Sequence, residues 1–195
     1  MSTTSITDSS EMEIDLNIKT IINQYRQSFS QKNYSDENND TDILMDLFNI
    51  SPNLKRENRQ YWGRELGMCW QLIISKLSEL RCPEFKPALK IEGDEPTDLF
   101  IGKDAIDTKY RIGSGDSGTL KKFKKYGELL TKQGYRPLLL ILREDNLPAA
   151  ITACRAGGWK IVVGEESFNY IKERTNFDLK DYFIKNKGNF SINRV

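Results

Sequence analysis

The sequence predicts an α/β domain with a mixed central sheet flanked by helices. Segments with helical periodicity alternate with short apolar segments, in the order helix, three strands, helix, strand, helix, strand, helix. The 195 residues are 38% hydrophobic and 29% charged, which is typical of a soluble globular protein with an apolar core. No internal repeat is visible.

The N-terminal part is predicted to be a helical extension of residues 13–56 that precedes a main domain of residues 57–195. Residues 1–12 are rich in Ser and Thr and offer little apolar surface, so we expect a disordered tail. Apolar residues then recur at helical spacing over Asp15–Gln31, and a shorter amphipathic helix is expected at Thr41–Phe48.

One long helix and three strands are expected next. After Ser51-Pro52-Asn53, apolar side chains from Trp62 to Leu80 fall on one helical stripe, and Pro83 marks the end of that helix. Turn residues separate three strand candidates, which are Ala88–Ile91, Asp98–Ile101 and Ala105–Ile112.

The rest of the main domain alternates helices with strands. The Gly/Ser loop Gly113–Gly118 leads into a predicted helix at Thr119–Gln133. Leu138–Leu142 is uninterrupted and apolar, as in a strand that is buried on both faces. A helix at Leu147–Ala156, a strand at Trp159–Val163 and one or two terminal helices follow.

The composition excludes several kinds of chemistry. Histidine is absent, which removes Ser-His-Asp and Cys-His nucleophile systems and histidine-based zinc sites. Cys69, Cys82 and Cys154 are far apart without a CxxC pair, so we expect buried thiols. The sequence has neither an apolar run of about 18 residues nor a signal-peptide pattern, so we expect a cytoplasmic protein without a membrane segment.

Charge is divided unevenly along the chain. Residues 1–50 contain nine acidic and three basic residues, whereas residues 103–136 contain nine basic and four acidic residues. A basic stretch in the core region can contact phosphate groups, although lysines on a helix also serve as a solvated face. Lys121 and Lys122 lie in this stretch, beside the apolar Leu120 and Phe123.

The most informative segment runs from Asp98 to Lys109. If Gly102-Lys103 forms a two-residue hairpin turn, Asp98 lies opposite Asp107 on the neighbouring strand. Because side chains alternate along a strand, Lys109 lies on the same face as Asp107, and Thr108 points the other way. Two facing carboxylates repel each other unless a proton or a cation lies between them. Magnesium meets this need, because it binds one or two carboxylates together with phosphate oxygens.

An Asp at the end of one strand, a short turn and then (D/E)-x-K on the next strand resemble the PD-(D/E)xK nuclease superfamily. The resemblance covers residues 62–163 and implies a restriction-endonuclease-like αβββαβ core. It implies Asp98, Asp107 and Lys109 as catalytic residues, and Mg²⁺ held by Asp98, Asp107 and a glutamate of the first core helix, here Glu65. Pro96 stands two residues before Asp98, whereas the superfamily often has Pro directly before this Asp.

The segment from Lys109 to Lys122 resembles type II restriction endonucleases, in particular an ApaLI-like group. This implies a homodimer that cuts double-stranded DNA at a short specific sequence. A DNA methyltransferase is expected in the same host without being a physical partner. The DNA contacts that we expect come from Arg111, Ser114, Ser117, Lys121 and Lys122.

Alternative interpretations remain open at this point. The (D/E)-x-K triplet occurs three times, also as Glu84-Phe85-Lys86 and Asp178-Leu179-Lys180, but only Asp107 has an acid facing it across a predicted hairpin. Glu65 could simply pair with Arg64, and Gly113–Gly118 could be a plain connector. Other functions are a structure-specific or repair nuclease, an inactive DNA-binding subunit and, least of all, a glycoside hydrolase.

Overall fold

The computed structural model describes residues 19–24, 26, 37–113, 115 and 117–192. The chain divides into two compact units, Met1–Asn33 and Tyr34–Val195. In the first unit, residues 19–24 and 26 are helical, which confirms the predicted N-terminal helix over these positions. The rest of that predicted helix, and the predicted tail, lie outside the described residues.

The second unit is an α/β structure built on a mixed five-stranded sheet in the order β1-β2-β3-β4-β5. Strands β1 to β3 are antiparallel, and β3, β4 and β5 are parallel. The strands are β1 Phe85–Pro87, β2 Leu99–Ile101, β3 Asp104–Lys109, β4 Arg136–Ile141 and β5 Lys160–Val163. The predicted class, a mixed sheet flanked by helices, is therefore confirmed.

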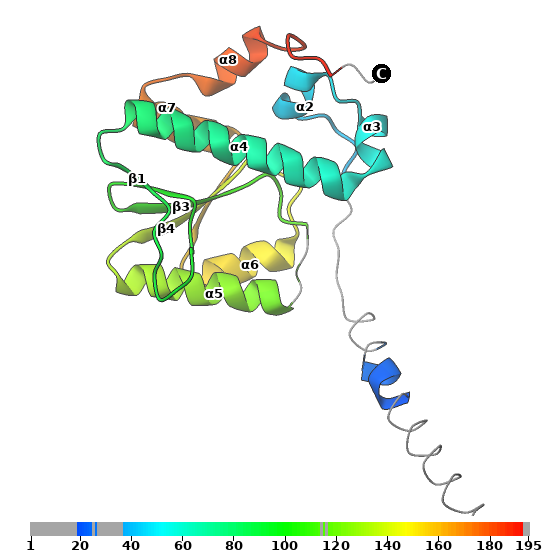
Figure 1. The fold of residues 1–195 in the computed structure, drawn as a ribbon, viewed down its shortest axis with the longest axis vertical. Coiled ribbons are helices and arrows are strands. Elements are labelled where there is room, and N and C mark those ends of the chain that lie inside the picture. Colours follow the sequence, from blue (N-terminus) through cyan, green and yellow to red (C-terminus); the bar gives the residue numbers. More distant parts are fainter. Residues whose placement is uncertain (1–18, 25, 27–36, 114, 116, 193–195) are drawn as a thin grey trace, which may run out of the picture. The chain divides into compact units, whose positions relative to one another are not determined.

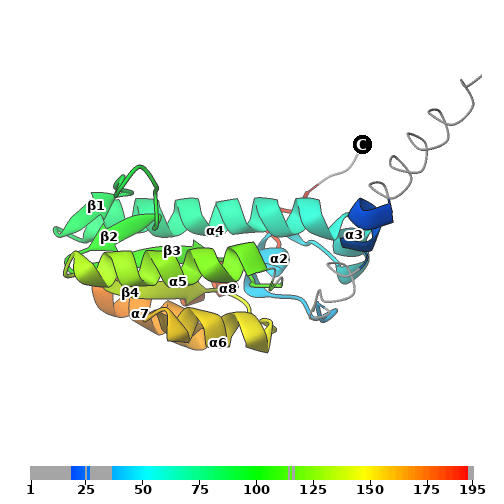
Figure 2. The ribbon, with the colours of Figure 1, turned by 90° about the horizontal axis from the view of Figure 1, so that it is seen from below.

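Helices cover both faces of this sheet. The helices of this unit are α2 Ile43–Phe48, α3 Pro52–Glu57, α4 Arg59–Arg81, α5 Ser117–Lys132, α6 Pro148–Ala156, α7 Glu165–Thr175 and α8 Leu179–Lys185. Figure 1 shows α4 and α7 on one side of the strands and α5 and α6 on the other, and Figure 2 shows the same layers from below. The predicted order of helices and strands is thus confirmed.

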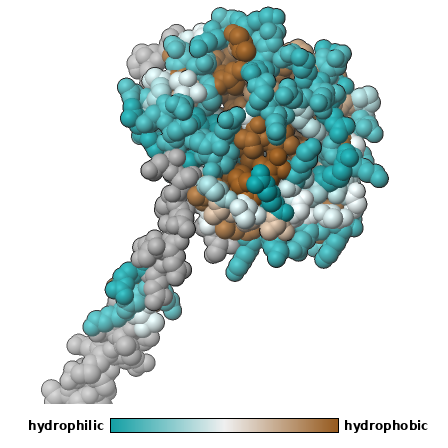
Figure 3. All heavy atoms as spheres, turned by 180° about the vertical axis from the view of Figure 1, so that it is seen from behind, coloured by the Kyte–Doolittle hydropathy of each residue, from teal (hydrophilic) through white to brown (hydrophobic). Residues whose placement is uncertain are grey.

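Each face of the sheet has its own hydrophobic core. Successive residues of a strand point to opposite faces of the sheet and so belong to different cores. Ile106 belongs to the core with Trp70 of α4, and Ala105 belongs to the core with Phe123 of α5. Cys82 and Cys154 are buried and Cys69 is half-buried, and all three thiols are free. The surface opposite to the view of Figure 1 is mostly hydrophilic around an apolar patch (Figure 3).

Helices α5 and α6 approach each other closely at two glycines. A Cβ atom on Gly127 would lie 1.9 Å from the carbonyl oxygen of Gly157, and a Cβ atom on Gly157 would lie 2.8 Å from Cα of Lys124. The backbones therefore meet at a distance that side chains would prevent.

Three predicted elements are wrong in their bounds. The strand expected at Ala105–Ile112 ends at Lys109. The strand expected at Ala88–Ile91 is a loop, and β1 instead occupies the three residues before it. Leu89 and Ile91 are apolar because they pack against the α5 core, without forming a strand ladder. The helix expected after Ser51 is split at Asn58, whose extended backbone ends α3 and whose side chain accepts a hydrogen bond from Tyr61 N of α4 at 3.0 Å.

None of the helices that the structure describes combines the length and the apolar content needed to cross a bilayer.

Candidate active site

The hairpin between β2 and β3 has the predicted register. Gly102 has a φ of 59°, which the first position of a type II′ turn requires, and Ile101 pairs with Asp104. The backbone N–H of Asp98 donates to the carbonyl oxygen of Ile106 at 2.9 Å. Asp98 therefore lies opposite Asp107 at the end of the ladder.

Asp107 and Lys109 meet on the face of the sheet that α5 covers. The ammonium nitrogen of Lys109 lies 2.7 Å from Oδ1 and 2.6 Å from Oδ2 of Asp107. Asp107 is 9% exposed. The pair lies within the last three residues of β3. A buried acid is thus held against a partly exposed cation.

Asp98 is held by Thr108, which is a correction to the expected orientation. Oδ2 of Asp98 accepts hydrogen bonds from Thr108 N at 2.7 Å and from Thr108 Oγ1 at 2.6 Å. We had expected Thr108 to point away from the two acids. Because Asp98 precedes the first ladder pair of β2, its carboxylate can turn toward the Thr108 hydroxyl.

A cavity of about 270 Å³ opens beside this pair. It lies between β3, helix α5 and the loop that joins β1 to β2. Its walls are formed by Glu95, Pro96, Asp107, Lys109, Thr119, Lys122, Phe123 and Tyr126. The cavity therefore combines carboxylates with two lysines over an apolar floor.

The pKa of Asp107 is raised to about 6, chiefly by burial and also by the nearby charge of Asp98, against the opposing effects of Lys109 and Lys122. A carboxyl group with this pKa is protonated or ionised near neutral pH, depending on its neighbours. Perturbed acids of this kind are concentrated at functional sites.

Lys122 and Tyr126 form one wall on successive turns of α5. The Lys122 ammonium lies 5.3 Å from the centre of the Tyr126 ring. A hydrogen bond with Tyr126 raises the pKa of Lys122, so this exposed lysine stays cationic. Its charge also acts on Asp107, which places a second cation next to the buried acid.

Several predicted site residues are not brought into this cavity. Glu65 pairs with Arg64 at 2.9 Å on α4, a helix that packs on the other face of the sheet, and Glu65 is absent from the cavity walls. Lys121 is exposed on α5. Arg111 is held by Asp145, with its Nε 3.1 Å from Oδ2. Ser114 lies outside the described residues, and Ser117 begins α5, but its side chain is not described.

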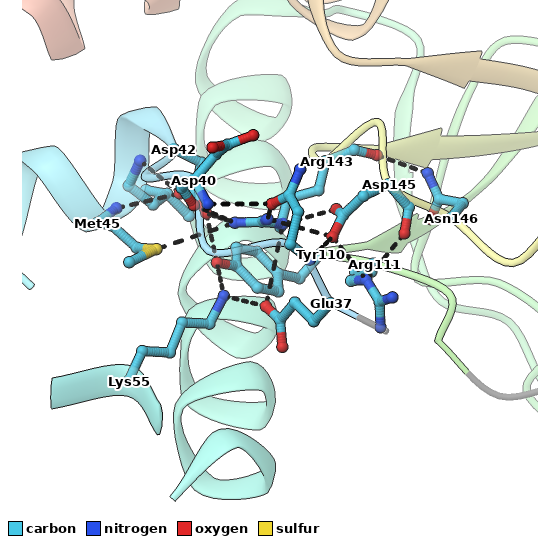
Figure 4. A network of polar contacts seen from close by, with 12 residues as sticks. Glu37, Asp40, Asp42, Met45, Lys55, Tyr110, Arg111, Arg143, Asp145 and Asn146 are labelled. Atoms are coloured by element: carbon cyan, nitrogen blue, oxygen red, sulfur yellow. Dashed lines mark hydrogen bonds and ion pairs between the residues drawn. The ribbon is translucent and has the colours of Figure 1, made fainter. Parts of the chain in front are cut away.

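A second group of buried charges, which no sequence pattern indicated, surrounds Arg143 (Figure 4). Arg143 is 5% exposed and lies 2.8 Å from Asp42 Oδ2 and 2.8 Å from Asp145 Oδ1. Burial opposes its charge, but hydrogen bonds to Asp145 and Asp42 raise its pKa. Lys55 Nζ donates to Tyr110 Oη at 2.6 Å, and the Tyr110 hydroxyl bonds Asp42. We call these five residues the Arg143 network.

The donor set of the cavity is suited to Mg²⁺. Asp107 supplies a carboxylate at the cavity wall, and Asp98 lies opposite it on the ladder but is not among the cavity walls. This cation accepts one or two carboxylates while it keeps several waters. The Lys109 ammonium already occupies the position of a cation beside Asp107. No group of three acids, cysteines or histidines close enough to hold a metal occurs among the described residues, so water or substrate would complete the ligands.

Three cavity residues were missed by sequence reasoning, namely Glu95, Thr119 and Tyr126. Tyr126 could have been found, because it stands four residues after Lys122 and so shares its helix face. Glu95 carries no such periodic signal, since it lies in a loop. Searches of protein-family models, curated proteins and solved structures found no significant match to this chain.

Proposed function

We propose that this chain is a Mg²⁺-dependent DNA endonuclease of the PD-(D/E)xK type. The proposal rests above all on Asp98 and Asp107 lying opposite each other on paired strands, with Lys109 bonded to Asp107 at the wall of a cavity. A stable sheet does not require two facing acids at a strand end. The order of one helix, three antiparallel strands, a helix and a parallel strand from α4 to β4 is compatible with the αβββαβ core.

Asp98 and Asp107 would hold the metal. When bound, Mg²⁺ would polarise a phosphoryl oxygen and lower the pKa of a coordinated water. The protein orients and buries the carboxylates that would hold this cation. Thr108 fixes the carboxylate of Asp98 through two hydrogen bonds, and the buried setting of Asp107 strengthens its interaction with any cation.

Lys109 is the candidate for positioning or deprotonating the attacking water. Its ammonium is bonded to both oxygens of Asp107, so a cation that binds there releases this lysine toward the cavity. A lysine freed beside a dication can orient the attacking water or steady negative charge on the phosphate.

Lys122 is the best placed of the predicted phosphate contacts, because it lines the cavity and stays charged. Lys121 and Lys124 are exposed on the same helix. Phosphate contacts of this kind position a duplex without reading its sequence. Cleavage at a short specific sequence by a homodimer, as in type II restriction endonucleases, is the finer part of the proposal and rests on sequence resemblance.

The test is cleavage of unmethylated phage DNA by the purified full chain, with and without Mg²⁺. Asp107→Asn is the decisive variant, and Asp178→Asn in the third D-x-K triplet is its matched control, because Asn keeps the helix cap of α8. We expect discrete Mg²⁺-dependent fragments for the wild type and for Asp178→Asn, and a loss of about 10³-fold for Asp107→Asn.

Equal cleavage by wild type and Asp107→Asn would overturn the assignment. Intact linear DNA in every lane, together with cleavage of branched or nicked substrates, would replace restriction with a structure-specific nuclease. Retained DNA binding without any cleavage would indicate an inactive binding subunit.

A further inference from the structure

We infer that the amino ends of the parallel strands form a surface for the phosphate groups of DNA, separate from the candidate active site. This strand-start surface is defined by Lys103, Arg136, Lys160 and Arg174. The choice of DNA as the ligand rests on the proposed function, whereas the surface itself follows from charge and geometry. Lys103 and Arg136 stand at the two ends of the basic stretch 103–136 of the sequence.

The sheet places a cation at the start of three neighbouring strands. Lys103 directly precedes β3, Arg136 is the first residue of β4, and Lys160 is the first residue of β5. Asp104 pairs with Arg136 in the ladder, and the backbone N–H of Arg136 donates to the carbonyl oxygen of Lys103 at 2.8 Å. The three cations therefore share one edge of the sheet, on the left in Figure 1, at the opposite end of β3 from Lys109.

Three helices add cations to the same edge. Helices α4, α5 and α6 end shortly before β1, β4 and β5 begin, so their last turns lie at the strand starts. The basic residues of these last turns are Arg81, Lys132 and Arg155. They offset the partial negative charge of the helix ends. Strands have only small net dipoles, so the cations at the strand starts have no such local role.

A pocket of about 180 Å³ lies in this surface, and Asp104 organises its cations. Oδ1 of Asp104 lies 2.7 Å from Arg136 Nη2, and its Oδ2 lies 2.5 Å from Arg174 Nη2 and accepts a hydrogen bond from the Tyr170 hydroxyl at 2.8 Å. Asp104 is 4% exposed, so a buried acid holds two guanidinium groups at the pocket wall, and Lys160 also lines it. A guanidinium has five N–H donors, so both groups keep donors for a phosphate.

The lysines of the surface are available for a ligand. Among the described residues, the side chains of Lys103 and Lys160 form no ion pair and no hydrogen bond, and both residues are exposed. Lys185 and Lys187, beyond the far end of α8, are in contrast each paired with an acid. The acid of the pocket wall besides Asp104 is Glu173, which is exposed. A phosphate can therefore contact the two lysines without breaking an ion pair.

DNA binding without metal tests this inference, by fluorescence anisotropy of a labelled duplex titrated with the full chain at several salt concentrations. The test variant combines Lys103→Gln with Lys160→Gln. The matched control combines Lys185→Gln with Lys187→Gln and removes the same charge elsewhere. We expect the test variant to bind about tenfold or more weakly and to lower the salt slope by about two, and the control to keep the wild-type slope.

Glu173→Gln provides a test in the opposite direction. It removes the exposed acid from the pocket wall and should tighten DNA binding about threefold, because the repulsion between this carboxylate and the phosphates is lost. A gain of affinity cannot result from misfolding. Thermal unfolding of every variant serves as the folding control, and all should unfold close to the wild type because the altered side chains are exposed.

Equal losses in the test and control variants would reduce the effect to net charge and overturn the inference. Wild-type affinity and slope in the test variant, with weaker binding in Lys122→Gln, would also overturn it and leave DNA at the cavity. Unchanged DNA binding with weaker binding to phosphatidylserine vesicles would assign the surface to a membrane instead. Because the measurement involves neither metal nor cleavage, the proposed function fails separately, through the Asp107→Asn cleavage assay.

Discussion

Two groups of buried charges meet at consecutive residues of the chain and differ in how their charges are balanced. Lys109 belongs to the cavity, and Tyr110 belongs to the Arg143 network. In the network, each buried charge has several partners, and hydrogen bonds from Arg143 lower the pKa of Asp145 although burial opposes this. In the cavity, burial dominates and the pKa of Asp107 rises. Complete pairing indicates a structural role, and incomplete pairing leaves room for a ligand.

Removal of the central cation should cost the network more than the cavity. Arg143→Met is expected to lower the free energy of unfolding by about 3–5 kcal/mol, because Asp42 and Asp145 would stay buried without their partner. Lys109→Met should cost clearly less, since Asp107 can take up a proton. Urea denaturation measures both values. An equal loss in the two variants would erase the distinction between the groups.

Mg²⁺ should stabilise the protein through the cavity alone. At a concentration about a hundredfold above its Kd, Mg²⁺ is expected to raise the free energy of unfolding by about 2.7 kcal/mol. The increment should vanish in Asp107→Asn and persist in Asp42→Asn, whose site is filled by Arg143 and Tyr110. Thermal unfolding with and without Mg²⁺ measures it. Persistence of the increment in Asp107→Asn would place the cation elsewhere.

The pH dependence of stability should also distinguish the two groups. Because the folded-state pKa of Asp107 is raised to about 6, the folded protein binds this proton more tightly than the unfolded chain does. The contribution of Asp107 to stability therefore falls as the pH rises through this range. From pH 5 to pH 7, without metal, the wild type should lose on the order of 1 kcal/mol relative to Asp107→Asn. Parallel curves for the two proteins in urea denaturation would contradict the raised pKa.

The smallest effect concerns the exposed edge of the cavity. Lys122→Gln should weaken DNA binding modestly and equally for all sequences, and should reduce the salt dependence of binding by about one counterion. Lys76→Gln, which removes a lysine paired with Glu79 on α4, is the control and should leave this slope unchanged. Fluorescence anisotropy at several salt concentrations gives both slopes. An unchanged slope in Lys122→Gln would mean that this lysine faces solvent and does not contact phosphate.

The sequence was sufficient for the features that depend on local geometry. The Gly102-Lys103 turn fixed the register of the hairpin, and the alternation of side chains then placed Lys109 beside Asp107. Periodicity located most helices and strands. The β1–β2 loop was misjudged because Leu89 and Ile91 show a strand-like pattern for a different reason, which is packing of a loop against the core.

Long-range contacts could not be predicted in the same way. Arg143 and Asp42 are 101 residues apart in sequence, and their types alone do not reveal that they pair. The same holds for Glu95, which reaches the site only through the path of its loop. Glu65 was expected on the strength of resemblance, and the packing of α4 determines which face of the sheet it occupies.

The close approach of α5 and α6 at Gly127 and Gly157 has a consequence for the cavity. Tyr126 and Gly127 are neighbours, so one residue faces the cavity and the next sets how far its helix stands from α6. The distance between α5 and α6 behind the cavity is therefore set by the absence of side chains at Gly127 and Gly157, neither of which lines the cavity. Substitutions at the two glycines would change the size of the cavity, whereas substitutions of the lining residues would change its chemistry.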